Sequence, residues 1–158
     1  VWGSTDVFYG LNHRRGAGTL RILGIDYGKK RMGLALSDPL GLTAQGLETL
    51  ECRGLEEDME ELSRLICEKG VEEIVVGLPK RMDASLGKEA QEVLRFVEDL
   101  KVKINLPVHM VDERLTTAGA HKIMKEGGLS RKERTRRADT IAAQIILQIY
   151  LDKRRKGL

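Results

Sequence analysis

Aromatic residues are scarce in this 158-residue chain, where tryptophan, tyrosine and phenylalanine together make up 4% of the sequence. Proteins that bind single-stranded nucleic acid by base stacking depend on such side chains. We therefore do not expect this chain to bind nucleic acid mainly through a base-stacking surface. The two cysteines, Cys52 and Cys67, are too few and too far apart for a zinc site or a Cys-x-x-Cys motif. We expect both to be buried, reduced thiols in a cytoplasmic protein.

Long hydrophobic runs are also missing, and no stretch approaches the roughly 20 apolar residues of a transmembrane helix. We therefore expect no membrane partner. Arg14 and Arg15 could suggest a twin-arginine signal, but no continuous apolar segment follows them. We expect residues 1–20 to form a disordered tail without a catalytic role, and residues 21–158 to form one domain.

The composition of the chain is typical of a soluble globular protein, with 41% hydrophobic and 32% charged residues. Hydrophobic periodicity predicts strands near residues 21–27, 31–37, 42–50, 71–77 and 106–113. It predicts helices through residues 55–66, 90–100, 117–125 and 130–151, with Gly70 ending the first and a Ser130–Glu133 capping box opening the last. A hairpin followed by alternating units favours a mixed sheet with helices on both faces.

Asp26 ends a strand that is otherwise apolar, directly before a turn at Tyr27 and Gly28. It is either a metal-binding carboxylate at the carboxyl end of a central strand or an aspartate that stabilises the turn. The residues alone favour neither of these two interpretations of Asp26.

A second acidic pair, Asp112 and Glu113, also lies at the end of an apolar strand. Because side chains alternate along a strand, only one of the two acids can face a common site. Asp112 could instead form an exposed ion pair with Arg114, and alternation alone does not choose between them.

Asp139 lies near the start of the last helix and is followed by the small residues Ala142 and Ala143. It could simply favour the helix macrodipole. The alanines, however, would let the helix approach the sheet closely and bring Asp139 to the strand ends. Three carboxylates in that arrangement suit Mg²⁺ or Mn²⁺.

Cationic clusters lie beside these acids or at strand ends, which suits a phosphodiester backbone next to a metal site. Such runs are also common on plain solvated surfaces. The hydroxyls of the threonines after the second acidic pair could contact phosphate or cap a helix. The candidate nucleic-acid contacts are Lys29, Lys30, Arg31, Lys80, Arg81, Ser85, Arg114, Thr116, Arg131, Lys132, Arg134, Arg136 and Arg137.

Four segments in order, GIDYGKKRMGLALSD, VVGLPKRMDASLG, DERLTTAGA and ADTIAAQIILQIYL, resemble the signature blocks of the YqgF family. The resemblance covers about residues 21–152 and implies a ribonuclease H-like fold, a five-stranded mixed sheet whose second strand is antiparallel to the others. It matches Asp26, Glu113 and Asp139 to the family's acidic triad, and it alone selects Glu113 over Asp112. One departure is Ala84, where the family usually has glycine; alanine is unfavourable there if the turn needs a positive φ.

The resemblance implies a cytoplasmic hydrolase, a nuclease dependent on Mg²⁺ or Mn²⁺ that processes the 5′ end of pre-16S ribosomal RNA in ribosome biogenesis. The expected partner is structured RNA or branched DNA, bound by a monomer or a homodimer. Two alternatives stay open: a Holliday junction resolvase acting on four-way DNA junctions, and a non-catalytic nucleic-acid-binding adaptor. A similar Asp-x-Gly hairpin occurs in sugar kinases and actin-like ATPases, but those enzymes need two such domains, which 158 residues do not supply.

Overall fold

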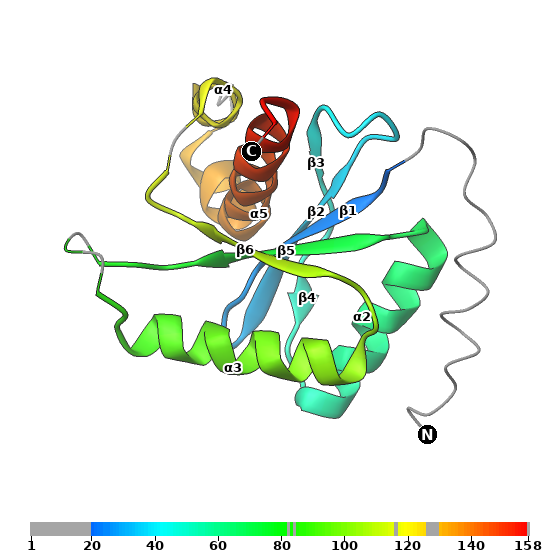
Figure 1. Ribbon diagram of the computed structural model, residues 1–158. Helices are drawn as coiled ribbons and strands as arrows, with labels where there is room; N and C mark the ends of the chain where they lie inside the picture. Colours follow the sequence, from blue (N-terminus) through cyan, green and yellow to red (C-terminus); the bar gives the residue numbers. More distant parts are fainter. Residues whose placement is uncertain (1–19, 82, 84, 116, 126–129, 158) are drawn as a thin grey trace.

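The computed structural model describes residues 20–81, 83, 85–115, 117–125 and 130–157, apart from the side chains of residues 131 and 134–136 (Figure 1). Residues 1–19 of the predicted tail, and Ala84, lie outside the described residues. Within the described part the elements are, in chain order, β1 (Ile22–Asp26), β2 (Arg31–Ser37), β3 (Ala44–Gly46), β4 (Leu50–Glu51), α2 (Leu55–Lys69), β5 (Glu73–Leu78), α3 (Lys88–Lys103), β6 (Val108–Asp112), α4 (Ala118–Lys125) and α5 (Arg131–Arg155).

The sheet is mixed, and its strands follow the order β3-β2-β1-β5-β6, with the two-residue β4 pairing with β2 as well. β2 runs antiparallel to β1 and β3, whereas β5 and β6 run parallel to β1. The predicted five-stranded mixed sheet with an antiparallel second strand is therefore confirmed.

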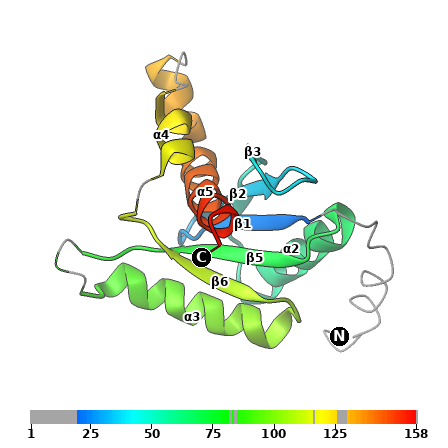
Figure 2. The same ribbon diagram turned by 45° about the horizontal axis from the view of Figure 1, so that its top comes forward.

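Helices cover both faces of this sheet, as predicted: α2 and α3 lie on one face, and α4 and α5 on the other (Figures 1 and 2). The alternation of side chains in the strands supplies a separate core to each layer. Leu23 and Ile25 of β1 belong to the buried cluster with α2 and α3. Their neighbour Ile22 and Val75 of β5 belong to the cluster with α4 and α5.

Local signals set the helix ends. Gly70 ends α2 in a left-handed conformation with φ 67°, and its N–H donates to the carbonyl of Ile66. Ser130 and Glu133 form the predicted capping box of α5. Thr117 Oγ1 accepts a hydrogen bond of 3.1 Å from the N–H of Ala120, so Thr117 caps α4.

The predicted strand over residues 42–50 is divided into β3 and β4. Ala35 pairs with Gly46, but Met32 pairs with Leu50, so the two residues of β2 between these pairs face three residues of the neighbouring segment. One extra residue in the 47–49 segment interrupts the ladder in the manner of a β-bulge.

Cys67 is exposed on α2, and Cys52 is only partly buried. The prediction of two buried thiols was therefore wrong. Cys67 follows the buried Ile66 directly, and the next position along a helix is rotated by about 100° towards solvent. Among the described residues, no helix has the length and apolar character needed to span a membrane.

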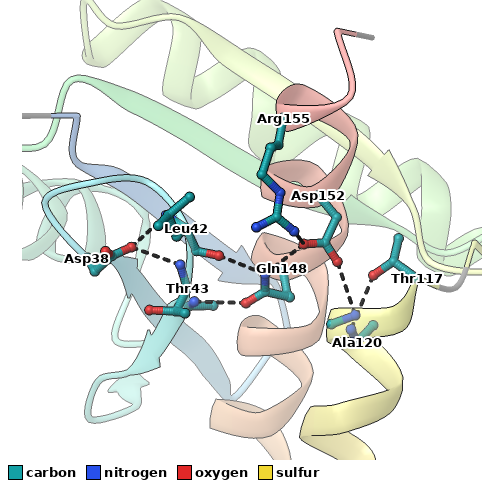
Figure 3. Close-up of polar contacts among 10 residues, drawn as sticks. Asp38, Leu42, Thr43, Thr117, Ala120, Gln148, Asp152 and Arg155 are labelled. Atoms are coloured by element: carbon teal, nitrogen blue, oxygen red, sulfur yellow. Dashed lines mark hydrogen bonds and ion pairs between the residues drawn. The ribbon is translucent and has the colours of Figure 1, made fainter. Parts of the chain in front are cut away.

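Buried polar side chains on α5 tie this helix to α4 and to the loop between β2 and β3 (Figure 3). Gln148 accepts a hydrogen bond from the N–H of Ala44 (3.0 Å) and donates to the carbonyl of Leu42 (3.0 Å) and to Asp152 (2.9 Å). Asp152 accepts in turn from the N–H of Gly119 in α4 (3.2 Å). Because these groups satisfy one another inside the protein, they specify how α4 and α5 sit on the sheet.

Glycines let the backbone of α5 come into direct contact with the sheet. A Cβ atom on Gly33 of β2 would lie 1.9 Å from the carbonyl oxygen of Asp139, and one on Gly24 of β1 would lie 3.1 Å from the carbonyl oxygen of Ala143. The buried Ala143 supports the prediction that its small side chain permits this approach. Any side chain on Gly33 would push α5 off the sheet.

We expect Gly33→Ala to lower the free energy of unfolding by about 3 kcal/mol or more, because the clash is with backbone and overpacking even against side chains costs about 1–3 kcal/mol. Gly46→Ala is the matched control, since a Cβ there would first meet the side chain of Thr140, at 2.5 Å. Urea unfolding monitored by circular dichroism measures both. Equal losses in the two variants would contradict a tight helix–sheet contact at Gly33.

Candidate active site

Asp26 lies at the carboxyl end of β1 and on the face of the sheet that α5 covers. Alternation assigns it to the same face as Ile22, which packs in the α5-side core, and as Gly24, against which Leu147 of α5 packs. In the antiparallel ladder Asp26 pairs with Gly33. The turn that follows is tight, because a Cβ on Gly28 would lie 2.5 Å from the carbonyl oxygen of Arg31.

Asp139 is brought to the same place by the packing of α5. Its carbonyl oxygen lies against Gly33, the residue that pairs with Asp26. The next residue, Thr140, donates a hydrogen bond of 3.1 Å to the carbonyl of Leu47 and holds this part of α5 to the sheet edge. Asp26 and Asp139, 113 positions apart in the sequence, are therefore neighbours.

Glu113 follows β6, and contacts within β6 show which face it shares. His109 stacks on Tyr150 of α5 with ring centroids 5.2 Å apart, and Val111 belongs to the α5-side core. Continuing the alternation places Glu113 on the α5 face and Asp112 on the opposite face. Alternation in the sequence could not tell which of the two acids faces the α5 side. The structure shows that it is Glu113.

Asp112 is held in a separate cluster by Arg114. The guanidinium group of Arg114 donates to both carboxylate oxygens of Asp112, with the closest contact at 2.7 Å, and to the carbonyl of Arg81 at 3.3 Å. Lys80 Nζ lies 3.9 Å from the same carboxylate. This Asp112–Arg114 cluster fastens the segment after β5 to the end of β6.

Gly77 provides the space between Asp26 and Glu113. Ile25 pairs with Val76, so Asp26 and Gly77 are the next residues along neighbouring strands. A Cβ on Gly77 would lie 2.5 Å from Glu113 Oε1 and 2.4 Å from the side chain of Ile146. The missing side chain lets the Glu113 carboxylate lie over β5, towards Asp26.

Burial and neighbouring acids raise the pKa values of Asp26 and Glu113. Desolvation by burial, and then the charge of Asp139, raises the pKa of Asp26 from 3.8 to about 6. Desolvation, followed by the charges of Asp26, Glu89 and Asp112, raises the pKa of Glu113 from 4.5 to about 7. Both shifts disfavour the ionised form, as expected for partly buried carboxylates with other acids nearby.

Asp112 shows the opposite behaviour. Hydrogen bonds from the Arg114 side chain are the main reason that its pKa falls from 3.8 to about 2. An acid whose charge is already satisfied by an arginine is a poor candidate metal ligand.

Comparison with known proteins identifies the family. The sequence model of the family described as "RuvX: Holliday junction resolvase" matches residues 20–153. The chain belongs to this family. Over 134 residues it is 50% identical to a protein of Moorella thermoacetica named "Putative pre-16S rRNA nuclease", covering 85% of this chain and 96% of that relative. A relative with the same name in Clostridium kluyveri is 52% identical over 135 residues, covering 85% of this chain and 98% of the relative.

A solved structure, Thermus thermophilus RuvC in complex with a Holliday junction substrate, has the same fold. Its TM-score is 0.56 at 16% identity, over 87% of this chain and 96% of that one. The resemblance to the YqgF family and the predicted fold class are thus confirmed for this RuvX-family chain.

The predicted cations of this RuvX-family chain fall into different surroundings. Arg31 Nε lies 3.4 Å from Asp139 Oδ2, at the acidic site. Lys29 instead pairs with Glu92 of α3 (3.0 Å) on the other face of the sheet. Lys30 is exposed at the hairpin tip.

The segment after β5 contains two more candidates beside Lys80, namely Arg81 and Ser85. Arg81 and Ser85 are exposed, and the N–H of Arg81 donates to the carbonyl of Ser85 (3.1 Å). The Ser85 hydroxyl donates to Asp83 (2.6 Å). Arg114 donates hydrogen bonds both to the carbonyl of Arg81 and to Asp112, so in the structure it links this segment to the end of β6.

The cationic cluster at residues 131–137 forms the first two turns of α5, directly before Asp139. Lys132 and Arg137 are exposed. The side chains of Arg131, Arg134 and Arg136, and the whole of Thr116, lie outside the described residues.

Sequence reasoning missed Glu89 and Gly77. Glu89, in the first turn of α3, is a fourth acid close enough to raise the pKa of Glu113. A signal for Gly77 was present, because a glycine ending a run of buried β-branched residues marks a place where another group approaches closely.

The three carboxylates are the ligand type that Mg²⁺ and Mn²⁺ prefer. In the described part of the chain, no three His, Cys, Asp or Glu side chains form a ready-made metal-binding group. The donor chemistry fits a divalent cation, since two acids with raised pKa values gain most from a neutralising charge. Side-chain movement would be needed to bring the oxygens together.

We expect Asp26→Asn to raise the melting temperature of the metal-free protein at pH 8. The pKa of Asp26 is raised in the folded state, so its contribution to stability is fully present below about pH 4 and is lost as the pH rises through about 6. An increase of about 2 °C or more at pH 8, the shift caused by about 1 kcal/mol in a chain of this size, should vanish at pH 4.

Asp112→Asn is the matched control and should do the opposite. The pKa of Asp112 is lowered, so its stabilising contribution is present at pH 8 and is lost only as the pH falls towards 2. Calorimetric melting in EDTA measures both variants. A fall in melting temperature for Asp26→Asn at pH 8 would contradict the proposed crowding of uncompensated acids.

Proposed function

We propose that this protein is a divalent-metal-dependent nuclease, with Asp26, Glu113 and Asp139 as the residues that hold the cation. The observation that carries the proposal is their convergence: one strand end, one residue after a second strand, and one helix bring three acids to the same face of the sheet. Bound there, a divalent cation would lower the pKa of an attacking water and stabilise the leaving oxygen of a phosphodiester.

The substrate we propose is the 5′ end of pre-16S ribosomal RNA, and this part of the proposal rests on the names of the relatives that are about 50% identical. A Holliday junction is the second candidate, because the family description names a junction resolvase. The chain offers few aromatic side chains for base stacking, so recognition of shape and charge suits either substrate.

The basic residues near the acids would bind the phosphate backbone. Arg31 lies at the acidic site, and the exposed Lys132 and Arg137 precede Asp139 on α5. Contacts of this kind position the nucleic acid without reading its sequence. We assign the same role to Lys30, Arg81, Ser85, Arg131, Arg134, Arg136 and Thr116, whereas Lys29, Lys80 and Arg114 keep it only if they leave their present partners.

We expect Asp26→Asn to reduce Mn²⁺-dependent cleavage of a pre-16S RNA fragment by more than about 100-fold, since even the partners of metal ligands are worth 10–100-fold. RNA affinity should persist, because the cations supply most of the binding energy. Asp112→Asn, one residue from Glu113 but held by Arg114, should retain cleavage. The assay measures product formation with each protein on the RNA and on a synthetic four-way junction, well below the melting temperatures.

The outcomes separate the candidates. Cleavage of the junction alone would replace the RNA substrate by a DNA one. Binding of nucleic acid without cleavage by the unmodified protein would favour a non-catalytic adaptor. Cleavage by Asp26→Asn at the unmodified rate would refute the site.

A further inference from the structure

Arg31 is placed to interact with two different partners. It opens β2 on the same face as Gly33, the residue against which the backbone of Asp139 packs. Its Nε lies 3.4 Å from Asp139 Oδ2, and 62% of its side chain is exposed. The guanidinium group is therefore beside the acidic site and also open to a ligand arriving from solvent.

The charges that raise the pKa values of Asp26 and Glu113 come from other acids. The charge of Asp139 raises the pKa of Asp26, and the charges of Asp26, Glu89 and Asp112 raise the pKa of Glu113. Among the ion pairs of the described residues, the pair of Arg31 with Asp139 is the one that includes a member of this trio. The other nearby cations are engaged elsewhere, since Lys29 pairs with Glu92 and Lys80 with Asp112.

We propose that Arg31 is an exchange cation, which pairs with Asp139 while the site holds no metal and moves to a substrate phosphate when a divalent cation takes that carboxylate. The inference rests on the proposed function of the site. It follows from charge and geometry: the Asp139 carboxylate pairs with Arg31 and would also be a ligand for the metal, and it cannot serve both cations equally. A guanidinium group released from a carboxylate is suited to bind a phosphate in the same way.

Metal and nucleic acid would then help each other to bind. A phosphate that attracts Arg31 frees Asp139 for the metal, and a metal on Asp139 frees Arg31 for the phosphate. Such coupling is reciprocal by thermodynamic necessity. Arg31 would neutralise Asp139 until a metal or a phosphate arrives.

The first test is titration calorimetry of Mn²⁺ into the protein without nucleic acid. Arg31→Gln should bind Mn²⁺ about two- to fivefold more tightly than the unmodified protein, the range expected for losing a competing exposed ion pair. Lys30→Gln is the matched control: it removes the same charge from the neighbouring, exposed residue. It should change the affinity less.

The outcomes distinguish this inference from the proposed function. If Arg31→Gln and Lys30→Gln bind Mn²⁺ equally well while Asp26→Asn binds it weakly, the metal site stands and the role of Arg31 is wrong. If the unmodified protein and Asp26→Asn bind Mn²⁺ alike, both proposals are overturned.

The second test examines the phosphate side of the exchange in EDTA. Asp139→Asn should strengthen binding of a short RNA duplex in the unmodified background, because it frees Arg31. The gain should be smaller in the Arg31→Gln background, and a double-mutant cycle isolates the difference. Equal gains in the two backgrounds would show that Asp139 acts on RNA only through its charge and would overturn the exchange.

Discussion

The contact between the backbone of α5 and Gly33 is the constraint on which the rest of the site depends. A Cβ at this position would lie 1.9 Å from the carbonyl oxygen of Asp139, so only a glycine lets the helix reach β2. Gly33 pairs with Asp26 in the ladder, and the contact therefore sets the two acids side by side. Further along α5, the hydrogen bonds of Gln148 and Asp152 hold the same helix against the loop after β2 and against α4. The backbone packing at Gly33 and the hydrogen bonds of Gln148 and Asp152 together fix the position of α5, and with it the position of Asp139.

Two neighbouring acids at the end of β6 have opposite physical roles. Asp112 is neutralised by Arg114, has a pKa of about 2, and fastens the segment after β5. Glu113 lies across Gly77 towards Asp26 and has a pKa of about 7. One residue along a strand is enough for this difference, because it moves a side chain from the α3 face to the α5 face. The energetic cost of crowding Asp26, Glu113 and Asp139 without a metal is typical of sites that are built for function more than for stability.

Much of this arrangement could be predicted from the sequence, and the parts that could not depend on contacts between distant residues. The strand ending in Asp26, the end of α2 at Gly70 and the capping box of α5 are local signals, and they appear as expected. The division of the 42–50 strand required the ladder with β2, in which one residue is extra. The family resemblance selected Glu113 over Asp112, but strand alternation alone could select it only once the structure showed that α5 covers the His109 face. The pairing of Arg114 with Asp112 was one of the alternatives that the sequence left open, and the structure selects it. The pairing of Lys29 with Glu92 could not be predicted, because a run of cations does not indicate which acids lie near it in the fold.

The central claim is that Asp26, Glu113 and Asp139 together hold a divalent cation. It is tested most directly by a crystal structure of the unmodified protein grown with Mn²⁺, with diffraction data collected so that manganese gives an anomalous signal. We predict an anomalous peak within about 2.0–2.3 Å of a carboxylate oxygen from each of the three acids, as is usual for small divalent cations bound by oxygen. A peak bound instead by Asp112 and Glu89, or well-ordered carboxylates with no anomalous peak between them at saturating Mn²⁺, would contradict it.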